Sequence, residues 1–382
     1  MYRKSIVNLV ILVILLFSAS SSVALAGQGN SLIGELSERD VFHPPASENP
    51  LSLWYNEWHY FNVIDEEQNL EIVTTLKLNG NVSDPDLNKS SAQVFLGYDI
   101  GGVPDASFGR YLTTDAAFSE DTANVRINKS SVELTPQGYH VYAESTDGNT
   151  VFDALFKPMV EPVQLNAESL PIGLFPIGSM NWLVASSKMK VEGTLTVDGQ
   201  IYTLKNARGY HDHNWGYWNW AAVGWDWGQV SQTKKNQQGN DVGTYSISFG
   251  NVTDSDHTDS VNSVLNVWKN KKVDASFNDT DMHITHSLND TMVILAPIGL
   301  PGMISAEYPE QTVINATSDN GDWVNITFTA EQPVPLPIPL TPLDPGYLII
   351  WEIIGEYEVE GVIDGKPVSF VAKGFLEYAA KF

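Results

Sequence analysis

Residues 210–216 read Tyr-His-Asp-His-Asn-Trp-Gly, a run of aromatic and proton-carrying side chains. Four more tryptophans follow at once, so that five of the chain's eleven tryptophans fall within thirteen residues. His211, Asp212 and His213 can hold or transfer protons and stand directly against them. Small-molecule sites typically combine an aromatic wall with a few polar groups. We therefore expect any chemistry of this protein to occur here.

On a β-strand, residues two apart face the same way. One face would then carry His211, His213 and Trp215, and the other would carry Tyr210, Asp212 and Asn214. Two different kinds of site are therefore possible. One is a metal site, because a His-x-His pair on a strand aims two imidazoles at one point. The third ligand would come from His59, His140, His283 or a carboxylate, and the sequence selects none of them.

The other site is for acid–base chemistry beside an aromatic wall. A histidine that is hydrogen-bonded to Asp212 would have a tuned pKa, and tryptophan faces stabilise a developing cation. That combination suits protonation or cyclisation of an apolar substrate with a carbon–carbon double bond. The structural alternative is that these polar side chains satisfy buried backbone groups while the tryptophans fill a core.

A second aromatic stretch lies near the N-terminus, at residues 53–61. Alternation puts Trp58 and Tyr60 on one face and Glu57 and His59 on the other. Both faces carry aromatic residues, which indicates a strand that is buried on both sides or forms a binding wall. A buried carboxylate is costly without a partner, and Arg208 or a histidine of the 211–213 pair would serve Glu57.

These elements are predicted to belong to a nearly all-β protein. Short alternating stretches are separated by turn residues, and no long amphipathic helix is evident. Segments 161–176 and 333–345 are proline-rich, and we expect an irregular segment and an extended connection there. The alternating stretches are Leu70–Leu78, Gln93–Tyr98, Ser187–Val197, Gly243–Ser248, Val324–Phe328 and Glu352–Gly361.

An internal repeat indicates two similar units. Val191-Glu192-Gly193, Asp198-Gly199 and Gly209-Tyr210-His211-Asp212 recur in order as Val359-Glu360-Gly361, Asp364-Gly365 and Gly374-Phe375-Leu376-Glu377. Each copy has the pattern of a last hairpin that closes an antiparallel barrel. We therefore predict a signal peptide at 1–26, an extension at 27–45, a first barrel at 46–216 and a second at 217–382. The 210–227 segment would lie where the two barrels meet.

The N-terminus predicts export. Arg3 and Lys4 precede an apolar run that is short for a membrane span, and Ala24-Leu25-Ala26 matches a cleavage site. An uncleaved anchor is the alternative. The chain has a formal charge of −25 and no cysteine, which argues against nucleic-acid partners and excludes thiol chemistry. Eight N-x-S/T sequons, including that of Asn251, are interpreted as surface positions open to glycosylation.

Two motifs resemble the lipocalin-like family that includes AttH and the carotenoid 1,2-hydratases (hydroxyneurosporene synthases). The early one reads Glu57-Trp58-His59-Tyr60-Phe61 here, with His59 in place of the family's second tryptophan. The central one reads Asp212-His213-Asn214-Trp215-Gly216, and residues 374–378 resemble the family's closing strand. The resemblance spans most of the chain after residue 50, and it implies a fold of two consecutive calycin-type antiparallel β-barrels.

For the family's hydratases, the resemblance implies acid-catalysed addition of water to an isoprenoid double bond by a His and a Trp that match His213 and Trp215. The family's Tyr-x-Asp pair lacks a clean counterpart, because the corresponding strand reads Tyr245-Ser246-Ile247. Asp226 and Asp241 are the alternatives for its acid.

Our first hypothesis is an exported lipocalin-like protein that binds an isoprenoid or similar lipid and hydrates or cyclises it, without a cofactor. The second is a non-catalytic carrier or an envelope-associated binding protein, and the third is a metal enzyme that uses His211 and His213. For the first, the expected catalytic residues are His213, Asp212 and Trp215. The expected ligand-binding residues are Glu57, Trp58, His59, Tyr60, Tyr210, His211, Asn214, Trp218, Trp225 and Trp227.

Overall fold

The computed structural model describes residues 32–45, 51–87, 89–172, 175–234, 236, 242–294, 302–340 and 346–382. The predicted targeting segment at 1–26 lies outside these residues. Within them, no helix has the length and apolar character needed to cross a membrane. The short helices are α2 (Leu32–Arg39), η1 (Ser52–Trp54), η2 (Thr113–Asp115) and η3 (Asp279–Asp281).

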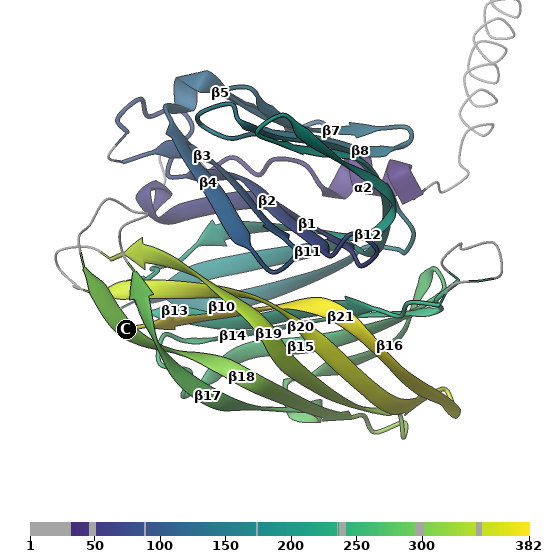
Figure 1. The fold of residues 1–382 in the computed structure, drawn as a ribbon. Helices are drawn as coiled ribbons and strands as arrows, with labels where there is room; N and C mark the ends of the chain where they lie inside the picture. The colour runs from purple at the N-terminus through teal and green to yellow at the C-terminus, as the bar shows by residue number, and fades with distance from the viewer. Residues whose placement is uncertain are drawn as a thin grey trace, which may run out of the picture.

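The strands form two antiparallel sheets that pack against each other (Figure 1). The first runs in the order β4-β3-β2-β1-β12-β11-β9-β8-β7-β6-β5, with β10 added beside β11. Its strands are β1 (Tyr55–Asp65), β2 (Leu70–Asn79), β3 (Ser91–Ile100), β4 (Pro104–Tyr111), β5 (Ala116–Phe118), β6 (Asn124–Ile127), β7 (Ser130–Thr135), β8 (Gly138–Glu144), β9 (Thr150–Pro158), β10 (Val163–Ile172), β11 (Phe175–Val197) and β12 (Gln200–Tyr217).

The second sheet runs in the order β16-β15-β14-β13-β21-β20-β19-β18-β17. Its strands are β13 (Val223–Ser231), β14 (Tyr245–Asp254), β15 (Ser260–Lys269), β16 (Lys272–Asn278), β17 (Met282–Ile294), β18 (Met303–Thr317), β19 (Trp323–Pro339), β20 (Tyr347–Ile363) and β21 (Lys366–Lys381). All of the alternating stretches expected from the sequence lie wholly or mostly within strands of the two sheets.

The internal repeat corresponds to equivalent hairpins. β11 and β12 turn at Asp198-Gly199, and β20 and β21 turn at Asp364-Gly365. Both residues of each turn have positive φ, which matches the twist of a tight hairpin and explains the Asp-Gly pairs. In each sheet the last strand then pairs with the first, β12 with β1 and β21 with β13.

Both proline-rich predictions were wrong in part. Val163–Ile172 forms β10, and the segment after Pro333 continues β19 as far as Pro339. Pro333, Pro335, Pro337 and Pro339 pair with β20 only, because β18 contacts β19 no further than Thr329. Alternate prolines at an edge direct their missing N–H groups to one side, so the pairing with β20 is retained.

Each sheet curves around its own apolar core, and a third cluster fills the space between the sheets. The first core includes Phe61, Phe156 and Leu76, and the second includes Phe277, Phe328 and Trp351. The third cluster joins Tyr60 and Tyr210 of the first sheet to Trp227 of the second. The two barrels therefore meet through aromatic side chains of the 55–61 and 210–227 segments.

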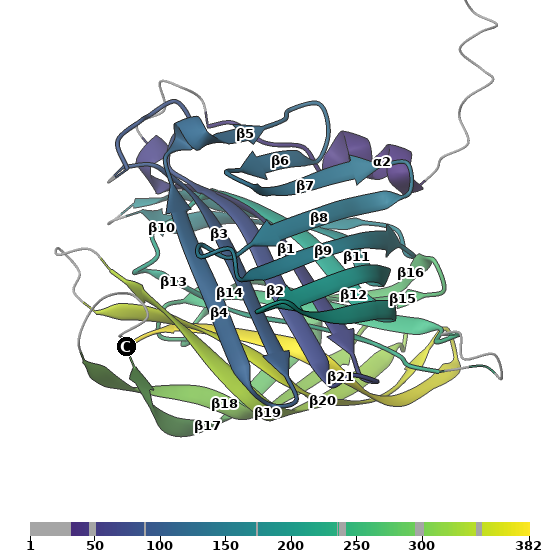
Figure 2. The ribbon, with the colours of Figure 1, turned by 45° about the horizontal axis from the view of Figure 1, so that its top comes forward.

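Helix α2 lies against the first sheet beside β7 and β8 (Figure 2). Leu36 on this helix is fully buried in the first core. The chain then inserts Asp40 into the barrel, where Tyr139 on β8 donates a hydrogen bond to its Oδ2 at 2.6 Å. The segment predicted as an N-terminal extension thus contributes to the core of the first barrel.

Candidate functional site

The two sequence motifs pair with each other across β1 and β12. His59 lies opposite His213, and Tyr60 lies opposite Asp212. The two faces separate as the alternation predicts. Glu57, His59, His211 and His213 point into the first barrel, whereas Trp58, Tyr60, Asp212 and Asn214 point toward the second sheet.

Inside the first barrel, Asp40 organises a closed polar network. His211 contacts Asp40 Oδ2 through Nε2 at 2.9 Å and the Tyr60 carbonyl through Nδ1 at 2.9 Å. His213 contacts Asp40 Oδ1 through Nδ1 at 2.7 Å and Glu57 Oε1 through Nε2 at 2.8 Å. Both ring nitrogens of each histidine are therefore engaged, and both rings are fully buried.

These contacts set the charges of the network. Burial alone would lower the pKa of His213, but the hydrogen bonds to Asp40 and Glu57 raise it to about 9. Burial alone would raise the pKa values of both carboxyl groups, yet the neighbouring histidines hold them below their ordinary values. His213 is thus a buried side chain whose two ring nitrogens both contact carboxylates.

One expectation about this region needs correction. Asp212 does not orient His213, because the two side chains lie on opposite faces of β12 and His213 is held by Asp40 and Glu57. Trp215 stacks on His43 at 3.7 Å, on the opposite face of the sheet from Trp58. Of the two partners expected for Glu57, the histidine is the one observed, because His213 contacts Glu57 whereas Arg208 pairs with Glu66.

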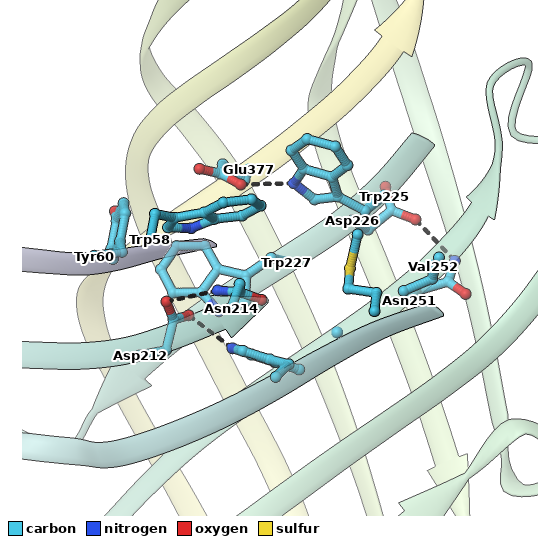
Figure 3. A pocket seen from close by; sticks show the side chains of 13 residues that line it. Trp58, Tyr60, Asp212, Asn214, Trp225, Asp226, Trp227, Asn251, Val252 and Glu377 are labelled. Carbon is cyan, nitrogen blue, oxygen red and sulfur yellow. Dashed lines mark hydrogen bonds between the residues drawn. The ribbon is translucent and has the colours of Figure 1, made fainter. Parts of the chain in front are cut away.

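A pocket of about 50 Å³ lies between the sheets (Figure 3). Six predicted residues line it, namely Trp58, Tyr60, Asp212, Asn214, Trp225 and Trp227. The other lining residues were not expected at a site from the sequence, namely Met180, Trp182, Gly250, Asn251, Val252 and Glu377, and Asp226 was expected only as an alternative acid. The pocket is thus aromatic on several sides, and its carboxyl groups come from both sheets.

Asp212 is one of these carboxyl groups. Its Oδ2 accepts hydrogen bonds from Trp182 Nε1 at 2.8 Å and from the Tyr210 hydroxyl at 2.9 Å. Asn214 Nδ2 donates to Oδ1 at 3.0 Å. Burial raises the pKa of Asp212 to about 8 in spite of these donors, so this group keeps its proton near neutral pH.

Glu377 is the second carboxyl group of the pocket, and it lies opposite Glu352 in the register of β20 and β21. Trp225 Nε1 donates to Glu377 Oε2 at 2.6 Å, and the Tyr60 hydroxyl donates to Glu352 Oε1 at 2.5 Å. Burial raises the pKa of both carboxyl groups, and each also hydrogen-bonds the other. Two adjacent buried carboxyl groups cannot both ionise, so the pair retains a proton.

The internal repeat indicates that Glu377 occupies a position equivalent to that of Asp212. It aligns Gly374-Phe375-Leu376-Glu377 with Gly209-Tyr210-His211-Asp212, and therefore aligns Glu377 with Asp212. Both residues line the same pocket from equivalent strands. No such sequence signal indicates Glu352, because its proximity to Glu377 depends on the strand register.

Trp218 and Trp220 lie beside Trp58 at one side of the pocket. Trp218 is fully buried and meets Trp58 edge to face at 5.5 Å without lining the pocket. Trp220 is half-buried and lies 6.1 Å from Trp58. The Lys77 ammonium lies 4.0 Å from the centre of the Trp220 ring and 4.9 Å from that of Trp58. Trp58, Trp220 and Lys77 thus form a half-buried border, in which burial lowers the pKa of Lys77 to about 7.

The raised pKa values predict that the free energy of unfolding falls between pH 6.5 and pH 9. His213 and Asp212 hold their protons to about 9 and about 8 in the folded chain, above their ordinary 6.5 and 3.8. The folded state therefore binds more protons in this range, and the stabilisation present at lower pH is lost as the pH rises. Urea unfolding at several pH values measures this change. Asp212→Asn should reduce the slope, and a stability that stays constant or rises would contradict the assignment.

No protein-family model and no curated protein matches the chain. Among solved structures, an AttH-type protein from Nitrosomonas europaea is 13% identical with a TM-score of 0.55, covering 89% of this chain and 100% of its own. Kievitone hydratase from Nectria haematococca is also 13% identical, with a TM-score of 0.52, covering 89% of this chain and 93% of its own. At this identity the likeness concerns the fold. The all-β expectation is confirmed, and the protein has the AttH-like, lipocalin-type fold of two consecutive antiparallel β-sheets.

Proposed function

We propose that the protein binds the unsaturated end of an isoprenoid or similar apolar molecule between its two sheets and protonates it. The observation that carries this proposal is the buried Glu352–Glu377 pair, of which Glu377 faces an aromatic pocket. A neutral carboxylic acid in an apolar site is a general acid that remains loaded at neutral pH. The acid in this proposal is Glu377, in place of His213.

The position of Glu377 at the pocket makes it the member of the pair that would pass the shared proton to a substrate. Each carboxyl group accepts one further hydrogen bond, Glu352 from Tyr60 and Glu377 from Trp225, so these bonds do not distinguish the two. Of the two, Glu377 lines the pocket. A proton on Glu377 can therefore pass to a substrate, and the residual charge is then shared between the two carboxyl groups.

The reaction is the addition of water to a carbon–carbon double bond. The Glu377 proton forms a C–H bond at one alkene carbon, and the electron pair of the double bond leaves a cation on the other. Nearby ring faces of Trp58, Trp225 and Trp227 stabilise this cation. Water then forms the C–O bond and returns a proton to the carboxyl pair, so that the acid is regenerated. Attack by a second double bond of the substrate instead forms a C–C bond that closes a ring and leaves the cation on that second unit. Loss of a proton from a neighbouring carbon to the carboxyl pair then forms a new double bond and regenerates the acid.

The pocket size limits what enters. About 50 Å³ holds a small reacting group or one to two water molecules, far less than the several hundred cubic ångströms of a full lipid site. The remaining chain of the substrate would lie against the half-buried Trp58 and Trp220. The fold that this chain shares with kievitone hydratase supports a hydratase interpretation.

The test is incubation of the purified protein with terminally unsaturated isoprenoids in deuterium oxide. We expect products with one deuterium on the protonated carbon and one hydroxyl group on its neighbour, identified by mass spectrometry and NMR. Cyclisation would give deuterated rings without added oxygen. Recovery of every substrate unchanged and without deuterium, at protein concentrations that bind it, would exclude the catalytic proposal.

The second candidate is a non-catalytic carrier, and the saturation of Asp212 by three donors favours it. Such a protein would retain an apolar ligand without changing it. We also propose, from the N-terminal sequence, that the protein acts outside the cytoplasm, at or near the cell envelope. Mass spectrometry of the N-terminus after expression in an exporting host tests this, with cleavage after Ala26 as the expected result.

A further inference from the structure

A second and larger cavity lies within the second barrel. It has a volume of about 380 Å³, and polar side chains form much of its wall. None of the site residues expected from the sequence lines it, although His283 and Asp226 were considered as alternatives for other roles. Asp226, Asn251, His257 and His286 are among the residues that line it.

Three of these residues bring metal-ligating atoms together. Asp226 lies on β13, His257 in the turn between β14 and β15, and His286 on β17. Asp226 Oδ1 is 3.2 Å from His286 Nε2 and 3.7 Å from His257 Nδ1. All three atoms lie within 4.8 Å of one another.

Further contacts fix the orientation of each ligand. His257 Nε2 donates to the Ala379 carbonyl at 2.8 Å, which leaves its Nδ1 lone pair facing Asp226. His286 Nδ1 lies 2.9 Å from Thr312 Oγ1, so a proton there leaves Nε2 free as a ligand. Metal-binding histidines typically use their second nitrogen in this way.

The two oxygens of the Asp226 carboxylate also differ, because one accepts a hydrogen bond and the other faces the histidines. Asn251 Nδ2 donates to Asp226 Oδ2 at 2.9 Å. Asp226 Oδ1 is buried and has no hydrogen-bond partner among the described residues, although both histidine nitrogens approach it. A buried carboxylate oxygen without a donor is costly, and a cation would satisfy it. The use of Asn251 here also corrects its interpretation as a surface sequon, because this side chain is buried.

We propose that Asp226, His257 and His286 bind a divalent transition-metal ion, with Zn²⁺ as the best match. Ligand bonds of about 2.0–2.2 Å in a tetrahedral site place donor atoms about 3.3–3.6 Å apart. The separations of 3.2 and 3.7 Å agree with this spacing. Two imidazoles and one carboxylate leave one coordination position open, and it faces the cavity, where a water molecule or a small polar ligand would bind.

The backbone conformation of His257 supports a functional role for its side chain. This residue has a φ of 54°, in the left-handed backbone region that residues other than glycine rarely adopt. The strained turn brings the imidazole over Tyr378, on which it stacks at 4.3 Å. Such strain persists where the surrounding structure favours one placement of a functional side chain.

The clusters around His211 and His213 in the first barrel do not offer an equivalent site, although His59 Nδ1, at 3.6 Å from Asp40 Oδ1, is also buried without a hydrogen-bond partner among the described residues. There, each nitrogen of His211 and His213 already contacts a carboxylate or carbonyl oxygen. Neither of the two cavities described above reaches Asp40 or Glu57. A metal ion in that barrel would have to displace hydrogen bonds, whereas the Asp226 site has an unsatisfied oxygen and an adjoining cavity.

The experiment is titration of the chelator-treated full chain with Zn²⁺ by calorimetry, followed by Co²⁺ binding with visible absorption spectroscopy. We expect one Zn²⁺ per chain and a Co²⁺ spectrum of low coordination number. His286→Gln and His257→Gln should each weaken binding by about 100-fold or more. Thr312→Val, which preserves shape but removes the oxygen beside His286 Nδ1, should weaken it by about 10-fold.

His140→Gln is the control for surface histidines, because His140 is exposed and pairs with Asp153 outside the cavity. It should leave Zn²⁺ affinity unchanged, and circular dichroism should show that all variants are folded. No stoichiometric Zn²⁺ binding, or equal binding by the wild type and His286→Gln, would overturn the proposal. Metal binding is measured without an apolar ligand. A protein that does not bind Zn²⁺ would therefore leave the proposal for the pocket between the sheets unaffected.

Discussion

Asp40→Ala is expected to lower the free energy of unfolding by about 3–5 kcal/mol, the range for removing one partner of a buried charged network. The substitution would leave Tyr139, His211 and His213 without the acceptor that joins them inside the first barrel. Because Asp40 is one of the two partners that raise the pKa of His213 to about 9, its removal would lower that pKa and leave the buried imidazole with Glu57 as its one remaining partner of the two. Equilibrium unfolding in urea, monitored by tryptophan fluorescence, measures the loss.

The matched control is Asp153→Ala. Asp153 also pairs with a histidine, at 2.7 Å from His140, but both side chains are largely exposed. Its removal should cost less than about 1 kcal/mol, because solvent screens exposed ion pairs. Equal effects of the two substitutions would mean that the buried network does not stabilise the fold as we describe.

Glu377→Gln is expected to reduce hydration or cyclisation by about 100-fold or more, the usual contribution of a general acid. Glutamine keeps the shape and can still accept the Trp225 N–H, but it has no acidic proton to transfer. Stability should stay about equal, because the pair already retains a proton and a neutral glutamine replaces a carboxyl group beside Glu352. The measurements are turnover and ligand binding for the same preparation, with binding largely retained.

Glu358→Gln provides the comparison, since Glu358 is an exposed carboxylate on the neighbouring β20. It should leave turnover unchanged. His213→Gln is informative in a different way, because the network assigns His213 to stability instead of proton transfer. Loss of turnover in a stably folded His213→Gln protein, together with full turnover in Glu377→Gln, would return the acid to His213.

The sequence by itself determined the local geometry of this protein. A strand has a period of two residues, so the run from Tyr210 to Trp215 could be divided into its two faces without knowledge of its neighbours. Asp-Gly pairs determine tight turns in the same local way, because both positions must adopt positive φ. The repeat of these hairpins was therefore enough to predict two successive antiparallel units.

Only the tertiary structure decided which side chains meet. Asp40 comes from a segment before the first strand, Glu352 meets Glu377 through strand register, and His257 and His286 converge on Asp226 through sheet curvature. Such contacts depend on how two sheets bury their apolar faces, and no periodicity along one strand encodes them. Asp212 and His213 illustrate both levels. The sequence predicted that these two side chains lie on opposite faces of the strand. The burial of Asp212 between the sheets and the pairing of His213 with Asp40 depend on the folded chain.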